Sequence, residues 1–522
     1  MADLPELRIG IDVGGTNTDA VVLDADGRVI AKAKRPTTPD VTEGLRAALD
    51  AVLAELGDES VRIGRVMLGT THATNAILER RGLGRVAVLR LGAPATTAVP
   101  PLSDWPGDLR KAVSAGEAIV PGGHYVDGRE ISRPDLDAVR RFLDGVEADA
   151  VAVTSVFSPA SSEHERLVEE LIGAEYGLPV SVSHEIGSLG LLERENATVL
   201  NAALYGVAGH VTDALVTALA ERGLGAKPYL AQNDGTLMTV EHAARLPVST
   251  IGSGPANSLR GAAFLSGVAD AIVVDVGGTS TDLGVLAGGF PRESAAAVEI
   301  GGVLTNFRMP DILAIALGGG TMVRSHGIGP DSVGYRIVRE ALVFGGNTMT
   351  MTDAAVAAGR SPRDAEGWRE RLETLRRDMS EENEDTLERA VAIADEMVVD
   401  AVDRMAFGKT DRPLVAVGGG AFLLPDRIPG VSQVIRPEHA EVANAVGAGI
   451  ALASGRVDTI LSAGDSRSEA IERAKEEAAA RAVTAGADPA GVEIVDLLEV
   501  PLSYLSEPAV RVHVKAAGPL AR

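Results

Sequence analysis

The chain lacks cysteine and is poor in aromatic residues. None of its 522 residues is cysteine, and Phe, Trp and Tyr together make up 3%. Without cysteine the protein has no disulfide, no thiolate nucleophile and no cysteine metal ligand. With so few aromatic rings, the 45% of hydrophobic residues must build a core mainly from Ala, Val, Leu and Ile. This composition is typical of a soluble globular protein.

Long apolar runs and a surplus of basic residues are also missing. No apolar run approaches the length of a membrane span, and the first seven residues carry Asp3 and Glu6 in place of a basic and apolar signal pattern. The net charge of −24 repels phosphate backbones and anionic lipids. We therefore expect a cytoplasmic protein with no nucleic-acid partner and no membrane partner. Any anionic ligand must be held by local groups.

Two common hydrolase signatures are absent. The nine histidines form no H-E-x-x-H pair and no cluster with metal-ligand spacing, which argues against a catalytic zinc. No G-x-S-x-G segment supports a serine hydrolase. Together with the absence of cysteine, this removes the usual nucleophiles of covalent amidohydrolases.

The most informative feature present is a duplicated segment. Asp12–Leu23 is DVGGTNTDAVVL and Asp275–Leu286 is DVGGTSTDLGVL, identical at nine of twelve positions. A β-branched run precedes each copy and an alternating apolar segment follows the glycines, so each copy predicts a β-hairpin with the glycines at its turn. A single Gly-Gly-Thr turn is only a turn. Two near-identical copies favour a shared function.

The residue types in the repeat suit a phosphate group and its cation. Glycine lets backbone N–H groups approach an anion closely, and the threonines at positions 16, 18, 279 and 281 add hydroxyls. Asp12 and Asp275 supply carboxylates suited to magnesium. We therefore expect the two hairpins to hold a nucleotide's phosphates from both sides, with both aspartates as metal ligands.

The rest of the chain predicts a two-lobed α/β protein with a small C-terminal addition. Its length corresponds to roughly three to four units of ordinary domain size. Strand and helix patterns alternate through the first 190 residues, apart from an irregular excursion predicted over 93–126, and the charged stretch 362–405 predicts a solvated helical pair. We place the domains at 1–190, 191–465 and 466–522, the last an α+β appendage of one charged helix and two strands.

Seven segments, in order, make the chain resemble a known family. They are GIDVGGTNTD (10–19), GTTHATNAILERRG (69–82), ERENATVLNAAL (193–204), QNDGTLM (232–238), SGPANSLRGA (253–262), VDVGGTSTD (274–282) and ANAVGAG (443–449). With the late Gly418-Gly-Gly420 turn, the hairpins look like the actin-like (ribonuclease-H-like) ATPase fold shared by actin, sugar kinases and heat-shock chaperones. Within that fold the chain resembles the hydantoinase A and oxoprolinase family.

The resemblance implies a nucleotide site and a reaction. It implies ATP and Mg²⁺ as cofactors, with the first hairpin at the γ-phosphate, the second at the β-phosphate and the Gly418 turn at the adenosine. The expected reaction is ATP-dependent opening of a cyclic amide such as a hydantoin, oxoproline or lactam, by phosphorylation of the ring carbonyl oxygen. The residues expected to hold the nucleotide are Gly14, Gly15, Thr16, Asn17, Thr18, Gly277, Gly278, Thr279, Ser280, Thr281, Gly418, Gly419 and Gly420.

The chain also departs from the family pattern. Members commonly carry Pro-Gly-Pro-Ala-Cys-Tyr-Gly after the middle glycine run, whereas this chain has GPDSVGY at 329–335. Its C-terminal part also looks shorter than in long hydantoinase A subunits. These differences leave the ring substrate open. In these respects the chain resembles a group of family members that act beside a thiohydantoin-desulfurase-like protein in place of the usual hydantoinase B-type partner. We also expect a homo-oligomer.

Three further residues are candidates for catalysis beside Asp12 and Asp275. His72 and Asn75 lie in the polar turn 69–75 on the expected substrate side, although a packing or capping role suits them equally. Asp234 precedes Gly235 and is a candidate substrate or metal ligand, although Asn-Asp-Gly is also an ordinary turn. Two other functions suit the same fold: a small-molecule kinase, and an ATPase that activates a partner protein.

Overall fold

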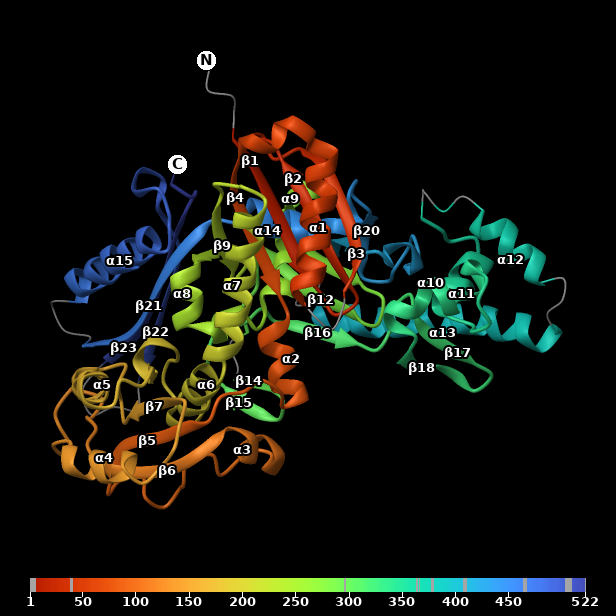
Figure 1. Cartoon of the computed structure of the whole chain (residues 1–522). Helices are drawn as coiled ribbons and strands as arrows, with labels where there is room; N and C mark the ends of the chain where they lie inside the picture. The colour runs from red at the N-terminus through yellow and green to blue at the C-terminus, as the bar shows by residue number, and fades with distance from the viewer. Residues whose placement is uncertain are drawn as a thin grey trace, which may run out of the picture.

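Three β-sheets form the frame of the computed structural model (Figure 1). The structure describes residues 6–37, 41–294, 297–362, 365, 367–376, 380–406, 411–462, 467–502 and 509–521. Within these residues the sheets have nine, six and four strands, and two short hairpins complete the β structure. The hairpins are β14 (Val298–Ile300) with β15 (Val303–Thr305), and β17 (Thr321–Arg324) with β18 (Gly327–Ser332).

The largest sheet combines strands from both ends of the chain. In spatial order its strands are β22 (Glu493–Leu502), β23 (Ala509–Gly518), β21 (Ala453–Ser462), β10 (Leu237–Thr239), β9 (Lys227–Ala231), β4 (Ile63–Thr70), β1 (Leu7–Val13), β2 (Asn17–Leu23) and β3 (Val29–Pro36). The domain boundaries predicted at 190/191 and 465/466 stay a prediction. The sheet itself extends across both limits, and its outer strands β22 and β23 come from the C-terminal α+β part.

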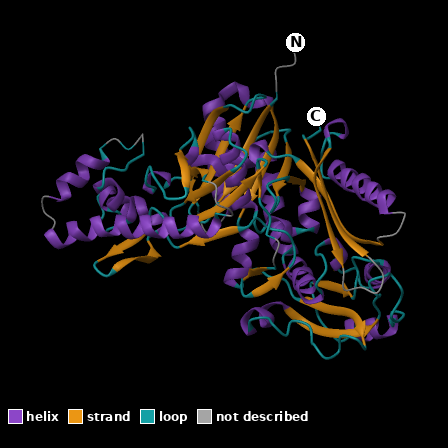
Figure 2. Cartoon of the chain, turned by 180° about the vertical axis from the view of Figure 1, so that it is seen from behind, coloured by secondary structure: helices purple, strands orange, loops and turns teal. Residues whose placement is uncertain are grey.

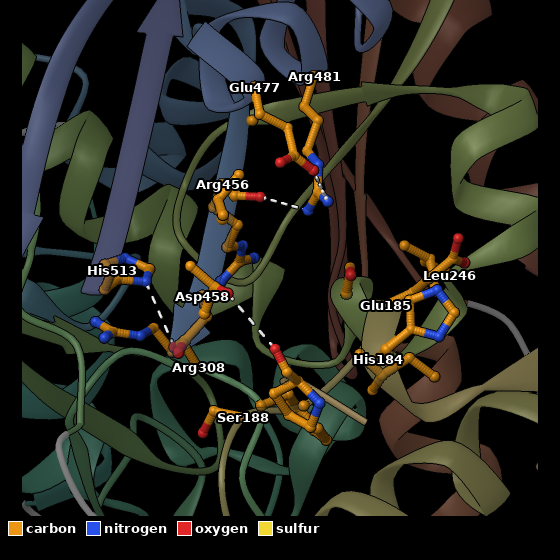
Figure 3. Close-up of a pocket in the computed structure, with 18 of the residues that line it drawn as sticks. His184, Glu185, Ser188, Leu246, Arg308, Arg456, Asp458, Glu477, Arg481 and His513 are labelled. Atoms are coloured by element: carbon orange, nitrogen blue, oxygen red, sulfur yellow. Dashed lines mark hydrogen bonds and ion pairs between the residues drawn. The ribbon is translucent and has the colours of Figure 1, made fainter. Parts of the chain in front are cut away.

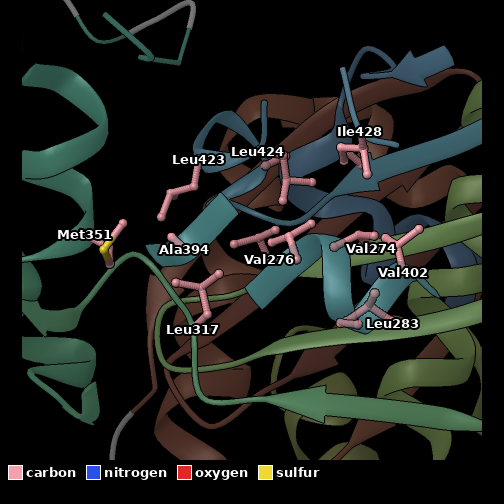
Figure 4. Packing of buried hydrophobic residues seen from close by; sticks show 14 of the residues in the cluster. Val274, Val276, Leu283, Leu317, Met351, Ala394, Val402, Leu423, Leu424 and Ile428 are labelled. Carbon is pink, nitrogen blue, oxygen red and sulfur yellow. The ribbon is translucent and has the colours of Figure 1, made fainter. Parts of the chain in front are cut away.

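The second sheet contains the other copy of the repeat. Its path is β13 (Phe290–Pro291), β12 (Thr281–Ala287), β11 (Ala271–Val276), β19 (Arg412–Val417) and β20 (Val431–Ile435), and β16 (Ile312–Ile315) also pairs with β12. One face of this sheet packs on helix α13 (Glu381–Met405) through branched aliphatic side chains, as Figure 4 shows. Val274 and Leu283 of the sheet and Val402 of the helix are all buried there, which confirms a core built with few aromatic rings.

The duplication extends beyond the two hairpins to a third strand in each sheet. β1 pairs antiparallel with β2, which sets Asp12 opposite Asp19, and parallel with β4, which sets Asp12 opposite Gly69. In the second copy β11 pairs antiparallel with β12, which sets Asp275 opposite Asp282, and parallel with β19. Both predicted hairpins are thus confirmed. Each repeat is a hairpin plus one parallel strand that ends beside its first aspartate.

Two helices cross between the repeats at glycine contacts. They are α9 (Ser253–Ser266) and α14 (Ala443–Ile450). A Cβ atom at Gly447 of α14 would lie 1.9 Å from the backbone oxygen of Asn257 in α9, and one at Gly261 would lie 1.8 Å from the backbone oxygen of Ala443. Leu259 packs with β11 and β19, while Val446 packs with β2. The crossing therefore joins the two sheets, and only glycine permits its close approach.

A smaller parallel sheet is attached on the far side from the α13 region (Figures 1 and 2). Its order is β6 (Ser114–Pro121), β5 (Val86–Ala93), β7 (Ala150–Ser155) and β8 (Val180–Val182). A fully buried ion pair fixes it to helix α6 (Leu191–Ala203): Arg90 of β5 donates from Nε and Nη2 to both carboxylate oxygens of Glu195, at 2.6 and 2.5 Å. Such a bidentate pair specifies one orientation of the two elements.

The remaining helices cover the sheets and their ends. They are α1 (Val41–Leu56), α2 (His72–Glu79), α3 (Gly107–Val113), α4 (Leu136–Leu143), α5 (Glu163–Glu175), α7 (Tyr205–Glu221), α8 (Val240–Arg245), α10 (Ile337–Glu340), α11 (Met351–Ala357), α12 (Trp368–Arg376) and α15 (Arg467–Thr484). No single helix of the described residues is long and apolar enough to span a membrane; only α6 and α7, bent by 48° at their junction, pass that test as a pair.

Two sequence predictions are wrong in detail. The excursion predicted as irregular at 93–126 contains α3 and β6. β6 is rich in small and polar residues and forms because it pairs with β5, so its stability comes from tertiary contact. The polar turn predicted at 69–75 is also no turn: β4 continues to Thr70 and α2 begins at His72.

The crossing of α9 and α14 predicts that one added methyl group destabilises the protein. Gly447→Ala places a Cβ against backbone atoms that cannot rotate away, so we expect a loss of roughly 1–3 kcal/mol or more. Gly209→Ala in α7 is the matched control, because nothing lies within 4 Å of its added Cβ, and it should stabilise by about 0.5–1 kcal/mol. Urea unfolding midpoints measure both changes. Equal midpoints for the two variants would contradict the tight crossing.

Candidate nucleotide site

The two hairpin turns have the same geometry and meet tip to tip. Gly14 N–H donates to the carbonyl of Asn17 at 3.0 Å, and Gly277 N–H donates to that of Ser280 at 2.9 Å. A Cβ atom at Gly278 would lie 3.2 Å from Cγ2 of Thr16, so the second turn faces the first across a van der Waals contact. This is the opposed arrangement that the repeat predicts.

Helix α9 reaches the first aspartate of both repeats. Asn257 donates to Oδ1 of Asp12 at 3.4 Å, and the next residue, Ser258, donates to Oδ2 of Asp275 at 2.5 Å. Asn444 of α14 donates to the other oxygen of Asp12 at 2.9 Å. The sequence does not predict these three residues as site residues, although Asn257 and Ser258 lie in the segment 253–262 and Asn444 lies in the segment 443–449.

Four carboxylates gather where the hairpins meet. Burial, followed by the charge of Asp19, raises the pKa of Asp12 to about 7, and burial with the charge of Asp275 raises the pKa of Asp282 to about 7. Burial also raises the pKa of Asp275. Burial raises the pKa of Asp19 as well, although Lys34, which pairs with it at 2.7 Å, acts against that rise, and the charge of Lys34 also lowers the pKa of Asp275. Asp19 and Asp282, which the sequence analysis also did not select, occupy the same offset in both repeats, and that repetition was the available signal.

This arrangement fits a magnesium ion that is completed by phosphate oxygens. Among the described residues no group of three or more His, Cys, Asp or Glu side chains converges as a full ligand set. Magnesium ordinarily takes one or two protein carboxylates and fills its shell with water and phosphate oxygens. Asp12 and Asp275 are two such carboxylates, and burial disfavours their charge unless a cation is near. Their role as metal ligands stays a prediction.

Glycines keep the space beside both aspartates free. A Cβ atom at Gly69 would lie 2.4 Å from Oδ1 of Asp12, and one at Gly418 would lie 2.2 Å from Oδ1 of Asp275. Gly418 also has φ +85°, which disfavours any larger residue. Gly420 N–H donates to the carbonyl of Val276 at 2.8 Å. The glycine turn at 418–420 thus lies against the base of the second phosphate turn, while Gly419 borders open space.

The hydroxyl groups of the repeat divide into two kinds. Thr18 and Thr281 are fully buried, and their hydroxyls bond internally, to Thr37 Oγ1 at 3.3 Å and to the Leu317 carbonyl at 2.5 Å. Thr16 is half-buried and Thr279 is exposed at the tips. Of the predicted hydroxyls, Thr16 and Thr279 are therefore available to a ligand as the chain stands.

The predicted substrate residues His72 and Asn75 point to different surroundings. His72 lines a small, largely apolar pocket with Val207 and Val211, and its Nδ1 lies 2.5 Å from Thr70 Oγ1. Burial, helped by the charge of His210, lowers the pKa of His72 to about 4. Asn75 instead donates to Thr71 Oγ1 at 3.5 Å, and Thr71 donates to the carbonyl of Val13 at the end of β1. Asn75 is thus linked to the end of β1 through the side chain of Thr71, whereas His72 is bonded to Thr70 of β4.

Asp234 is held elsewhere. Its Oδ2 lies 2.8 Å from Nζ of Lys515 in β23, and its Oδ1 accepts from the Thr236 hydroxyl. Burial raises the pKa of Asp234, but Lys515 and other partners outweigh that effect and hold it well below the usual range. The structure does not bring it to Asp12 or Asp275 through any contact among the described residues. Its catalytic role stays a prediction.

Two repeats that face each other, with crossing helices between their sheets, define a two-lobed protein of the actin-like ATPase fold. Comparison with solved structures agrees. ATP-dependent caprolactamase from Pseudomonas jessenii superposes with a TM-score of 0.75 at 22% identity, and nucleotide-free acetone carboxylase with 0.70 at 19% identity. Both superpositions cover 99% of this chain and 88% of the other.

Family models identify the family within this fold. Residues 8–176 match the hydantoinase/oxoprolinase N-terminal region, and residues 194–457 match the hydantoinase/oxoprolinase model. The chain belongs to the hydantoinase/oxoprolinase family.

Two curated relatives resemble it over a similar range. The caprolactamase alpha subunit of Pseudomonas jessenii is 29% identical over 395 residues, covering 68% of this chain and 54% of the relative. The acetophenone carboxylase gamma subunit of Aromatoleum aromaticum is 28% identical over 395 residues, covering 67% and 53%. The chain thus spans about half the length of these relatives.

The raised pKa of Asp12 predicts a specific pH dependence of stability. Because the folded-state pKa lies above the unfolded value, the stabilisation from protonated Asp12 is complete below about pH 4 and is lost as pH rises through about 7. Asp12→Asn cannot ionise, so its melting temperature should fall less than that of the wild type between pH 5 and 8.5, by an amount equivalent to up to a few kcal/mol.

Thermal unfolding in the absence of nucleotide and magnesium measures this difference in slope. Asp58→Asn, at an exposed position in the 3-10 turn Gly57–Arg62, is the control and should keep the wild-type slope. An Asp12→Asn variant with the same pH dependence as the wild type would show that Asp12 does not titrate in this range.

Proposed function

We propose that the protein is an ATP-dependent hydrolase, or the ATP-using subunit of one, that opens or activates a cyclic amide such as a hydantoin, oxoproline or related lactam. The observation that carries the proposal is the pair of opposed turns, each with an aspartate that accepts a hydrogen bond from α9. The name of the caprolactamase relative, an enzyme of a lactam, supports the substrate class. In broader terms, the proposed protein is an ATP-dependent enzyme that acts on a carbonyl compound.

The chemistry explains why such an enzyme uses ATP. An amide carbonyl is a poor electrophile. Transfer of the γ-phosphoryl group to the ring oxygen forms one P–O bond as the bond to ADP breaks, and it leaves a carbon that water attacks more readily. Breaking the ring C–N bond and releasing phosphate completes the hydrolysis. The chain's contribution is to position the two reactants and to neutralise charge.

Each part of the site has a role in this proposal. Backbone N–H groups at the tips of the two turns would hold the phosphates, except those of Gly14 and Gly277, which bond within their own turns. The 418–420 turn would face the adenosine, and Asp12 and Asp275 would hold Mg²⁺, which would neutralise phosphate charge. Asn75 lies on the substrate side, linked to β1 through Thr71. His72 has a depressed pKa and is therefore neutral, so it could donate a hydrogen bond from Nε2 to the ring carbonyl.

A partner subunit is part of the proposal. The two relatives are named as the alpha subunit of one enzyme and the gamma subunit of another. We propose a hydantoinase B-type or thiohydantoin-desulfurase-like protein as partner, and a homo-oligomeric arrangement of this chain.

Turnover of ATP against a panel of ring amides tests the function. We expect ADP release that depends on a ring substrate and on Mg²⁺, with an opened, unphosphorylated product. Asp275→Ala should lower this rate by about a hundredfold or more, because the phosphate charge loses its cation. Asp270→Ala, at the exposed start of the same hairpin, should keep it. A stable phosphorylated product would instead indicate a kinase, and turnover that only a protein stimulates would indicate a partner-activating ATPase.

The substrate side is tested by comparing two losses in the same variants. His72→Ala and Asn75→Ala should each lower ring-dependent kcat by about tenfold or more while changing the KM for ATP by less than about twofold. Glu79→Ala at the exposed end of α2 is the control. If either variant loses ATP affinity in proportion to activity, its residue belongs to the nucleotide site or to packing. Because His72 has apolar surroundings, its variant tests most directly whether this residue serves only packing.

A further inference from the structure

A second cavity of about 680 Å³ lies away from the phosphate turns. Its walls come from the segments 158–166, 184–188 and 306–308, the turn after β9, helix α8, the strands β21 and β23, and helix α15. No residue of either phosphate hairpin lines it. Its size is that of an ordinary small-molecule site. Figure 3 shows Arg456, Arg308 and His513 on one side of the opening, with His184 and Glu185 across from them.

The cavity is rich in arginine although the whole protein is strongly acidic. Six arginines line it against three acidic residues, in a chain of net charge −24. Each acidic residue already has an arginine partner: Glu185 pairs with Arg245, Glu477 with Arg481, and Asp458 with Arg511 outside the lining. The negative charge of the walls is therefore already neutralised by ion pairs.

Three lining arginines keep their guanidinium groups unpaired. Among the described residues, the guanidinium groups of Arg166, Arg456 and Arg473 form no ion pair and donate no hydrogen bond, although the charge of Arg456 lowers the pKa of the nearby Asp234 and Glu293. Arg308, by contrast, pairs with Glu293 at 3.1 Å. Arg456 is the most enclosed of the three, since it is half-buried on β21 while the other two are exposed on α5 and α15. A half-buried, unpaired guanidinium facing a cavity offers donors in a fork that matches a carboxylate or phosphate.

Two of the histidines that line the cavity lie in charged surroundings, one among arginines and one between two carboxylates. The pKa of His242 is lowered first by burial and then by the charges of Arg245, Arg456 and Arg481, so these three positive charges converge near one ring. His513 is 2% exposed, and neither of its ring nitrogens has a hydrogen-bond partner. The nearest carboxylate oxygens, of Asp458 and Asp496, lie 3.7 and 3.8 Å away. A buried ring whose nitrogens lack hydrogen bonds at ordinary distance needs an explanation, and a bound ligand or water that completes them is one.

We propose that this cavity is a binding site for a small organic dianion, held by Arg456 and Arg473, and that it is distinct from the nucleotide site. The shared chemistry of the ligand is two acidic oxygen groups, as in a dicarboxylate or a phosphate ester. Asn233 connects the cavity to the rest of the protein, because its side-chain oxygen accepts from Gly252 N–H at 2.7 Å, directly before α9. One wall residue of the cavity is thereby bonded to the residue that precedes the helix contacting Asp12 and Asp275.

Isothermal titration calorimetry on the nucleotide-free protein tests the site. Glutarate represents the dicarboxylates and glycerol 3-phosphate the phosphate esters, while glutaramide and glycerol are their neutral counterparts. We expect one anion or both to bind with 1:1 stoichiometry and less tightly as salt rises. Arg456→Gln should weaken that binding by about tenfold or more, as the loss of a charged hydrogen-bond partner does. Binding of glutarate would identify the ligand class as dicarboxylates, and binding of glycerol 3-phosphate would identify it as phosphate esters.

The variants are chosen to separate this site from folding and from the nucleotide site. Arg473→Gln lies on an exposed helix face and repeats the test should Arg456→Gln fail to fold. Arg133→Gln, whose side chain is 91% exposed outside the cavity, should bind as the wild type does. Asp275→Ala should also retain anion binding, so loss of ATP turnover and loss of this site remain distinguishable.

Several results would overturn the proposal. They are failure of both anions to bind the wild type, equal binding by the neutral counterparts, or wild-type affinity in folded Arg456→Gln and Arg473→Gln. Failure of the small anions combined with binding of an acidic protein segment to the same arginines would overturn it too, because the cavity would then be a protein interface.

Discussion

The crossing of α9 and α14 is the contact on which the rest of the site depends. At that crossing the backbones approach so closely that a methyl group at Gly447 or Gly261 would overlap a carbonyl oxygen. The approach brings Asn257 and Asn444, one from each helix, to the same carboxylate of Asp12. It also sets Ser258 against Asp275. One helix pair thereby fixes the distance between two turns that stand 263 positions apart in the chain.

Electrostatics divide the molecule into two unlike centres. Between the hairpins four carboxylates gather with one lysine, and burial raises the pKa of all four. Around the second cavity the excess is positive, because its carboxylates are already paired. Only the second centre is opposite in sign to the net charge of −24 of the chain. Local geometry, and not net charge, decides which ligands each centre can hold.

The C-terminal residues have a structural role that composition does not suggest. β22 and β23 extend the sheet that contains the first hairpin of the repeat. Lys515 of β23 pairs with Asp234, a residue that follows a strand of that sheet nearly three hundred positions earlier. This buried pair explains why Asp234, selected from sequence as a ligand, has a partner already. His513, two residues before Lys515, lines the second cavity.

The sequence by itself determined the repeat, and with it the hairpins, the glycine turns and the positions of Asp12 and Asp275. These follow from local rules: alternating apolar residues form strands, and glycine permits the tight turn. The tertiary structure alone decided which side chains surround those aspartates. Asn257, Ser258 and Asn444 lie on helices whose apolar pattern shows only that they are buried, and their polar partners depend on how two helices cross.

The difference between local rules and long-range packing also explains the two wrong sequence predictions. β6 forms by pairing with β5, and α2 begins two residues after β4 ends, where the sequence shows only polar residues. The arginine cavity had no sequence signal, because its walls come from segments between positions 158 and 513 that share no pattern. Local structure such as a turn or a strand can be predicted from neighbouring residues, whereas contacts between distant segments depend on how the whole chain packs.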